Sequence, residues 1–143
     1  MLFRSVGTMP EKETVERAKK DLREGKKPTT AAGEFVREEM EHIREGKHGA
    51  RSTKQAIAIG LSKARRAGVP LKPPAKGQAK ARTRSSARRA YEVGQGRRKP
   101  GRPSARRSRA VLAALKREGH KAASRKALST HARRTARRRR TAR

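Results

Sequence analysis

The stretch STKQAIAIGLSKARRAG, residues 52–68, carries the clearest folding signal in this chain. Ser52 followed by Gln55 three positions later has the spacing of a capping box, in which two side chains satisfy the first amides of a helix. Gly68 can adopt the left-handed backbone that commonly ends a helix. These start and stop signals predict a helix over 53–67.

This helix has two chemically different faces. Ile57, Leu61 and Ala64 recur at helical spacing and form an apolar stripe. Gly60 lies beside the stripe and permits the close approach of another helix, since it has no side chain. The opposite face carries the basic residues Lys54, Lys63, Arg65 and Arg66. We therefore expect the helix to pack through its apolar side.

Two further helices are predicted upstream. Thr8 followed by Glu11 has the spacing of a second capping box, and Gly25 is the expected end of the first helix. Thr30 is the expected cap of the next helix, which ends at Gly46. The apolar stripe of that helix consists of Val36, Met40 and Ile43, with Phe35 beside them. Together the three helices favour a small helical region.

Parts of this region resemble a known family. The strings EFVREEM at 34–40 and KQAIAIGLSKAR at 54–65 are similar to those of small basic bacterial proteins that are catalogued as a domain of unknown function. Residues 109–134 are also similar to a segment that accompanies this pair in longer members. The resemblance implies a bacterial cytoplasmic setting and brings no activity, ligand or catalytic residue.

Charge divides the chain into two unlike parts. Residues 1–45 carry ten acidic and ten basic side chains, whereas 46–143 carry 32 Lys and Arg against only Glu92 and Glu118, which yields the whole net charge of +30. A polycation this dense repels itself when compact and binds polyanions with release of counterions. The expected partner is double-stranded DNA, with RNA as the alternative polyanion.

The composition favours a mostly α-helical protein with a small core. Only Phe3, Phe35 and Tyr91 are aromatic, so we expect a marginal core that a dimer or a bound polyanion completes. The expected organisation is a small helical domain at 1–68, a Pro- and Gly-rich basic linker at 69–108, and a basic helical tail at 109–143. This long tail is expected to be partly disordered, with one or two short helices.

The linker contains the segment RRKPGRP at 97–103, which resembles an AT-hook. In such a hook, glycine allows close backbone approach, proline keeps the chain extended, and arginine enters the narrow minor groove of A·T-rich DNA. Pro100 stands where a hook has its first core arginine, so Arg102 alone is left to insert. A plain basic linker is the alternative interpretation.

The tail ends in RRTARRRR at 133–140, and residues 119–143 contain no acid. Arginine at this density is typical of an arm that neutralises phosphates without recognising bases, although such a run can also serve solubility. Helices over 109–118 and 124–140 could be arranged as a helix-turn-helix. The second has only Leu128 as a large apolar residue, which argues against docking and against sequence-specific recognition.

No pattern in the sequence indicates catalysis or metal binding. His42 and His48 lie six positions apart across a glycine, a spacing outside the usual metal motifs, and we expect both to lie on the surface with His120 and His131. The acidic residues Glu38, Glu39, Glu41 and Glu45 are expected to face solvent. The chain has no cysteine. We therefore expect no cofactor, no metal and no enzymatic activity.

The apolar segments are short. The longest apolar run, 56–61, is far shorter than the roughly 20 residues that cross a bilayer, and the N-terminus lacks a secretory apolar stretch. We expect no membrane association and a cytoplasmic protein located on the bacterial nucleoid.

These observations predict a DNA-binding, nucleoid-associated protein that contacts phosphates, and possible minor-groove sites, without sequence preference. The expected contact residues are Arg97, Arg98, Lys99, Arg102, Arg106, Arg107, Arg109, Arg133, Arg134, Arg137, Arg138, Arg139 and Arg140. One alternative is an RNA- or ribosome-associated protein. Another is a helical interaction module with a basic tether, in which helices 31–45 and 53–67 contact a protein partner or a second copy. The contact residues in that case are Val36, Met40, Ile57 and Leu61.

Overall fold

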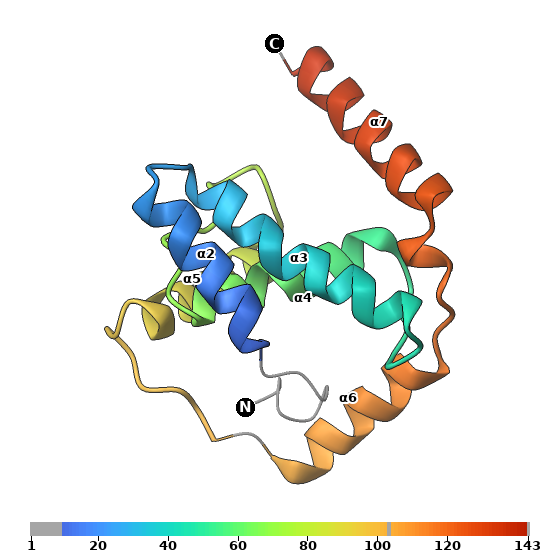
Figure 1. The fold of residues 1–143 in the computed structure, drawn as a ribbon, viewed down its shortest axis with the longest axis horizontal. Helices are drawn as coiled ribbons and strands as arrows, with labels where there is room; N and C mark the ends of the chain where they lie inside the picture. Colours follow the sequence, from blue (N-terminus) through green and yellow to red (C-terminus); the bar gives the residue numbers. More distant parts are fainter. Residues whose placement is uncertain (1–9, 103, 143) are drawn as a thin grey trace.

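The computed structural model describes residues 10–102 and 104–142. Within these ranges the chain forms six α-helices and one 3₁₀ turn, and no β-strand (Figure 1). The elements are α2 (Lys12–Arg23), α3 (Pro28–Arg44), α4 (Thr53–Arg66), α5 (Ala81–Gly94), α6 (Ala105–Arg117), η1 (Lys121–Ala123) and α7 (Arg125–Thr141). The prediction of a mostly α-helical protein is confirmed. No helix in these ranges combines the length and apolarity that a bilayer crossing demands.

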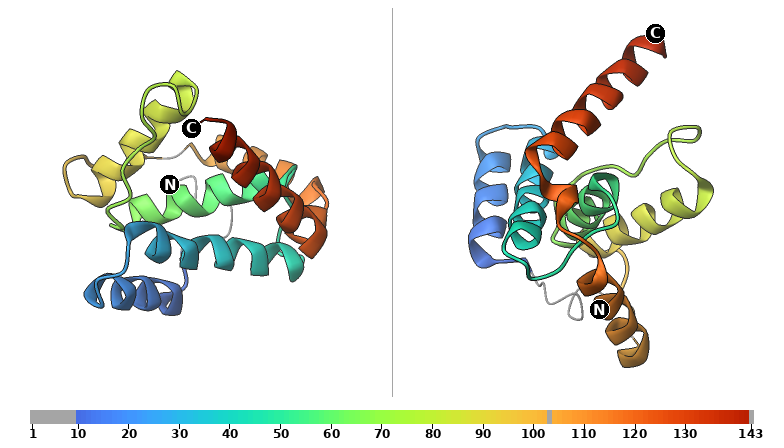
Figure 2. Two further views of the ribbon diagram at one scale, coloured as in Figure 1. Left: turned by 90° about the horizontal axis from the view of Figure 1, so that it is seen from above. Right: turned by 90° about the vertical axis from the view of Figure 1, so that its right-hand side faces the viewer.

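Helix α3 is the centre of the molecule, with α2 packed on one side and α4 on another (Figure 2). Phe35 is fully buried in an apolar cluster that joins the first half of α3 to α2 and to the end of α4. Ile43 is fully buried in a second cluster, which joins the second half of α3 to α4 and to η1. Both clusters are rich in alanine, so the helices meet at short range and the core stays small.

Gly60 sets the distance between α3 and α4. A Cβ at this position would lie 2.7 Å from the Cα of Val36, closer than real Cβ atoms approach a backbone. The backbones of the two helices therefore touch where the glycine has no side chain. The expected close approach at this residue is confirmed.

The predicted start of α4 is confirmed. The Oγ of Ser52 accepts a hydrogen bond from the amide of Gln55 at 3.1 Å. The side chain of Gln55 returns to the amide of Arg51 at 2.7 Å, one residue earlier than the usual capping box. The predicted glycine ends are also confirmed, because Gly25, Gly46 and Gly68 have φ angles of +78°, +78° and +104°.

The predicted cap of α3 at Thr30 is wrong. The helix begins at Pro28, and Lys27 occupies the cap position without a side-chain hydrogen bond. Proline favours the first helical position because its φ is already helical and its missing N–H is not needed there. Helix α2 begins at Lys12 with Glu11 as its cap, and Thr8, the expected cap, lies outside the described residues.

The expected partly disordered tail is also not what the structure contains. Helix α6 has 13 residues and α7 has 17, so neither is a short helix. Helix α6 starts after Ser104, whose Oγ accepts from the amide of Arg107 at 3.3 Å, so it begins four residues before the predicted range of 109–118. The predicted start of the last helix at 124 is confirmed, because Ser124 caps α7 and its Oγ accepts from the amide of Ala127 at 3.1 Å.

The chain between α6 and α7 is fastened to the core by hydrogen bonds. The amide of Gly49 donates to the carbonyl of Leu115 at 2.9 Å, and the Oγ1 of Thr53 donates to the carbonyl of Ala122 at 2.6 Å. The Nε of Arg44 donates to the carbonyl of Ala123 at 3.0 Å. From this anchor, α6 and α7 point away from each other (Figure 2). Their exposed cations therefore lie on different sides of the core.

Candidate nucleic-acid interface

The thirteen residues predicted to contact nucleic acid lie on three elements, and all of them are exposed. Residues 97–99 and 102 follow α5, residues 106, 107 and 109 lie on α6, and residues 133, 134 and 137–140 lie on α7. Six of these cations line one of two concave surfaces, and the other seven are exposed outside them.

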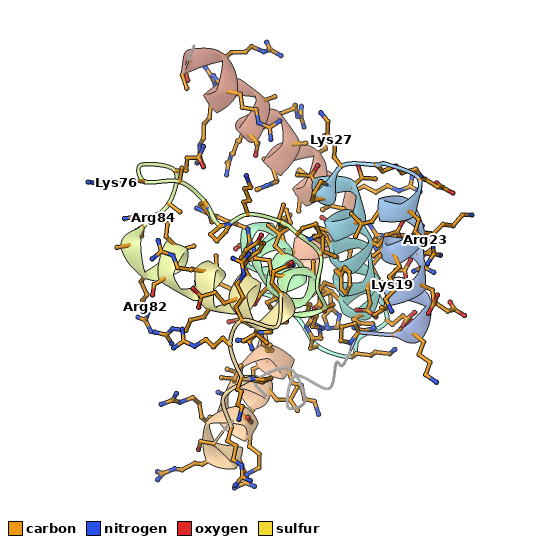
Figure 3. All side chains as sticks on the ribbon, turned by 90° about the vertical axis from the view of Figure 1, so that its left-hand side faces the viewer. Lys19, Arg23, Lys27, Lys76, Arg82 and Arg84 are labelled. Carbon is orange, nitrogen blue, oxygen red and sulfur yellow. The ribbon has the colours of Figure 1, made fainter. Side chains whose placement is uncertain are left out.

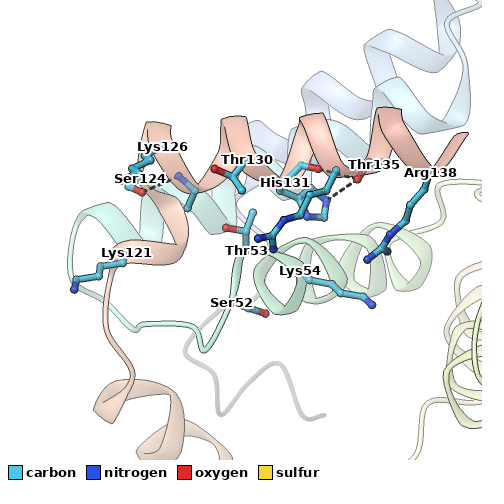
Figure 4. Close-up of a pocket in the computed structure, with 12 residues that line it drawn as sticks. Ser52, Thr53, Lys54, Lys121, Ser124, Lys126, Thr130, His131, Thr135 and Arg138 are labelled. Carbon is cyan, nitrogen blue, oxygen red and sulfur yellow. Dashed lines mark hydrogen bonds between the residues drawn. The ribbon is translucent and has the colours of Figure 1, made fainter. Parts of the chain in front are cut away.

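The first concave surface is a cleft of about 640 Å³ between α7 and the N-terminal end of α4, which we name the α4–α7 cleft. Its lining residues are Ser52, Thr53, Lys54, Lys121, Ser124, Lys126, Ala127, Thr130, His131, Arg134, Thr135 and Arg138. No acidic side chain is found among these described lining residues. Figure 4 shows Lys54 and Arg138 extending into the cleft from α4 and α7. The cleft is therefore lined by hydroxyl groups and cations.

Helix ends add to the positive potential of the α4–α7 cleft. Ser52 and Ser124, the N-caps of α4 and α7, both line it, so two helix N-termini are at the same cleft. The N-terminus of a helix carries a partial positive charge and amides that favour anions. Each serine Oγ is already engaged by the amide three residues ahead. Lysine and arginine therefore supply the free donors for an anion such as phosphate.

The second concave surface lies between α5 and α6, and we name it the α5–α6 hollow. It has a volume of about 370 Å³ and six basic lining residues, which are Arg66, Arg89, Arg98, Lys99, Arg102 and Arg107. Burial lowers the pKa of Arg66, but a guanidinium stays protonated at neutral pH. Arg98 lies 3.3 Å from the carboxylate of Glu92, one of only two acids after residue 45. The hollow thus keeps a large excess of positive charge.

The structure brings together only part of the predicted set. Four of its members line the α5–α6 hollow, namely Arg98, Lys99, Arg102 and Arg107. Two line the α4–α7 cleft, namely Arg134 and Arg138. The other seven are exposed but line neither surface, and they are Arg97, Arg106, Arg109, Arg133, Arg137, Arg139 and Arg140.

Both concave surfaces also contain cations from outside the arginine-rich runs, which were not among the predicted contact residues. Lys54, Lys121 and Lys126 line the α4–α7 cleft, and Arg66 and Arg89 line the α5–α6 hollow. The signal for Lys54 and Lys126 was present, because each follows closely after a serine that the sequence marked as a helix cap. A basic residue in the first turn of a helix is at an unfavourable end of the helix dipole, which indicates a role other than stability.

Six side chains that the sequence placed at the surface are buried, and one of them is Arg65, which was expected on the basic face of α4 and exposes 8 %. Glu38, Glu39, His42, His48 and Lys63 were expected on the surface or on the basic face of α4, and each exposes 4 % or less. The reason is that α3 contacts α2 and α4 at once, so little of its circumference faces solvent. A prediction from helical periodicity assumes that only one face of a helix is buried.

Several of these buried groups pair with one another as ions of opposite charge. The Nζ of Lys63 donates to Oε1 of Glu39, and the Nε2 of His48 lies 3.2 Å from Oε2 of the same carboxylate. Burial raises the pKa of Glu39, but the close approach of His48 Nε2 and the charge of Lys63 outweigh burial and hold that pKa below its usual value. The adjacent Glu39 carboxylate raises the pKa of His48 despite the opposing effect of burial. The Glu39 carboxylate is therefore held between two cationic groups, Lys63 and His48.

Comparisons of the chain with protein-family models, with curated proteins and with solved structures find no match. The residues themselves are therefore the basis of the functional argument.

Proposed function

We propose that this protein binds double-stranded DNA through its phosphates and without sequence preference, as a nucleoid-associated protein. The observation that carries the proposal is the α4–α7 cleft, in which five cations and two helix N-termini converge and no acid lies among the described lining residues. Such a surface attracts a phosphate backbone and has no apparent means of recognising bases.

Exposure of the remaining arginines supports the same proposal. Long arginine side chains on α6 and α7 carry the excess charge outward from two sides of the core (Figure 3). Two such surfaces on one molecule can contact two duplexes, or two segments of one duplex, which would bridge DNA. Bridging is the activity expected of a compacting protein.

The alternative of a protein-interaction module needs exposed apolar surface on α3 and α4, and little of it is available. Met40 exposes 5 % and belongs to the second core cluster, against which Val36 and Ile57 also pack. Leu61 packs against the first cluster. Most of the stripe thus contributes to the fold, which favours nucleic acid over a protein partner. The nucleoid as a location and kinship with the small basic bacterial family stay predictions, as does the expected lack of enzymatic activity.

The test compares two variants that lose the same charge. The cleft variant carries Gln at Lys54, Lys121, Arg134 and Arg138, which line the α4–α7 cleft. The α2 variant carries Gln at Lys12, Lys19, Arg23 and Lys27, which are exposed on and just after α2. Figure 3 labels three of these control residues. Both variants fall from +30 to +26 in net charge.

We expect the cleft variant to bind a labelled duplex of mixed sequence about a hundredfold more weakly at physiological salt, measured by fluorescence anisotropy. The α2 variant should lose less than about threefold, since its cations lie among acids. Equal losses in both variants would contradict a role for the cleft. Competition by ribosomal RNA at lower concentration than duplex DNA would favour the RNA alternative instead.

A further inference from the structure

Three buried side chains near the end of α3 form a group that the proposed function does not use. Glu39 and His42 lie one turn apart on α3, and His48 lies in the loop that leads to α4. Each offers a nitrogen or oxygen, and these three atoms lie within 4.8 Å of one another. The exposed fractions are 0 % for Glu39, 4 % for His42 and 1 % for His48. Solvent therefore contributes little to their hydrogen bonding.

Each of the three residues holds a buried polar atom without a hydrogen-bond partner. These atoms are Oε2 of Glu39, Nδ1 of His42 and Nε2 of His48. Two of these atoms form a close pair, because Nε2 of His48 lies 3.2 Å from Oε2 of Glu39 without the alignment of a hydrogen bond. Buried polar atoms in folded proteins are almost always partnered. Three residues that each hold such an atom, and whose ligand atoms cluster, indicate a site for something that accepts lone pairs.

The hydrogen bonds around the group leave lone pairs directed inward. The Nδ1 of His48 lies 2.9 Å from the carbonyl of Gly49, to which it can only donate, so in the neutral ring Nε2 carries the lone pair. A backbone carbonyl that fixes the far nitrogen in this way is the usual outer partner of a metal-binding histidine. Lys63 donates to Oε1 of Glu39, whereas Oε2 of the same carboxylate has no hydrogen-bond partner.

We infer that Glu39, His42 and His48 bind a divalent transition metal, with Zn²⁺ as the best fit. Two imidazoles and one carboxylate are a ligand set that zinc accepts, whereas Mg²⁺ and Ca²⁺ prefer oxygen ligands alone. Zinc–ligand bonds are about 2.0–2.2 Å long, so atoms that lie as far as 4.8 Å apart move closer together when the ion binds. A second buried carboxylate, Glu38, lies beside His42 and offsets the added positive charge.

The position of the group gives the metal a structural role. His48 precedes Gly49 and Ala50, whose amides donate to the carbonyls of Leu115 and Gly119 at 2.9 and 3.2 Å. A metal held by His48 therefore fixes the loop on which the chain between α6 and α7 is fastened. Bound metal is expected to stabilise the attachment of α6 and α7 to the core, because a ligand that binds only the folded state raises its stability.

The experiment uses the full chain, freed of nucleic acid and dialysed against chelator. Zn²⁺ and Co²⁺ are each titrated into the protein, with calorimetry, the visible absorption of Co²⁺ and the melting temperature as readouts. We expect one equivalent per chain, a tetrahedral Co²⁺ spectrum, and a melting temperature several degrees higher with Zn²⁺. The His48→Gln and His42→Gln variants should each lose at least tenfold in affinity. The His120→Ala variant, which removes an exposed histidine, should bind as the unaltered chain does.

Circular dichroism in the absence of metal tells whether each variant folds, and the Co²⁺ spectrum of the unaltered chain tests the site without any variant. Failure of the unaltered chain to bind Co²⁺ or Zn²⁺ at micromolar concentration overturns the inference and leaves a proton shared by Glu39 and His48 as the explanation. Binding that persists unchanged in a folded His42→Gln,His48→Gln double variant also overturns it. Neither result bears on DNA binding, which the cleft variant tests separately.

Discussion

The two ends of this molecule use charge in opposite ways. In the three-helix core, α2 to α4, charged side chains pair with one another and some are fully buried, as with Glu39 and Lys63. In α5 to α7 every cation except the half-buried Arg84 is exposed, and residues 46–143 offer only Glu92 and Glu118 as acidic partners. Lysine and arginine therefore contribute to folding where an acid accompanies them, and remain available for a polyanion where none does.

The largest effect on stability is expected from the buried pair. Replacing Lys63 by Met leaves Glu39 buried without its main cation, which should lower the free energy of unfolding by about 3–5 kcal/mol. Denaturant unfolding at neutral pH measures the loss. The matched control is Lys54→Met on the same helix, where an exposed lysine is removed and less than about 0.5 kcal/mol should change. Equal losses of stability in the two variants would show that the buried ion pair contributes no more to stability than an exposed lysine does.

A smaller effect is expected where α3 meets α4. The Gly60→Ala change places a Cβ 2.7 Å from the Cα of Val36, so the helices must separate, at a cost of about 1–3 kcal/mol. The same change at Gly33 in α3 meets nothing within 4 Å and should stabilise the protein by about 0.5–1 kcal/mol through helix propensity. Thermal melts of both variants provide the comparison. A stabilised Gly60→Ala protein would contradict the observed helix contact.

The boundary between the two parts can be weakened at Thr53. The Thr53→Val change removes the hydrogen bond to the carbonyl of Ala122 and leaves that buried carbonyl without its side-chain donor, at a cost of about 1 kcal/mol. Thr30→Val, at an exposed position of α3, controls for the change from threonine to valine. Hydrogen exchange of the amides in α7 should increase in the Thr53 variant alone. Unchanged exchange there would mean that this bond does not fasten the tail.

The sequence allowed the ends of α4 to be predicted because they depend on neighbours in the chain. Ser52 accepts from an amide three residues away, and Gly68 ends the helix through its own backbone. The burial of Glu39 and Lys63 depends instead on residues 24 positions apart, on two helices that enclose the same space. Helical periodicity holds no information about a second helix, so these residues were assigned to the surface.

The candidate interface was predictable to a similar degree. Runs of arginine indicated exposed cations, and the structure places all of them at the surface. The α4–α7 cleft could not be predicted, because it exists only where η1 returns to the core and sets α7 beside Lys54. That return depends on hydrogen bonds such as Thr53 to Ala122, which join residues 69 positions apart.

The smallest expected effect concerns Arg102 in the AT-hook-like segment. Arg102 lines the α5–α6 hollow with five other cations, so Arg102→Gln removes one of several and should weaken DNA binding about fivefold. As a plain basic linker, the segment should show the same loss on A·T-rich and G·C-rich duplexes of equal length. A loss confined to A·T-rich DNA would instead indicate insertion of Arg102 into the minor groove.

The salt dependence of DNA binding tests the central claim most directly. The logarithm of the affinity of the full chain for a duplex should fall linearly with the logarithm of salt concentration, with a slope of about −0.9 per phosphate contact. The cleft variant should have a slope smaller in magnitude by about 3–4, and the α2 variant should keep the slope of the unaltered chain. A slope near zero, or equal slopes for the cleft variant and the unaltered chain, would contradict the account.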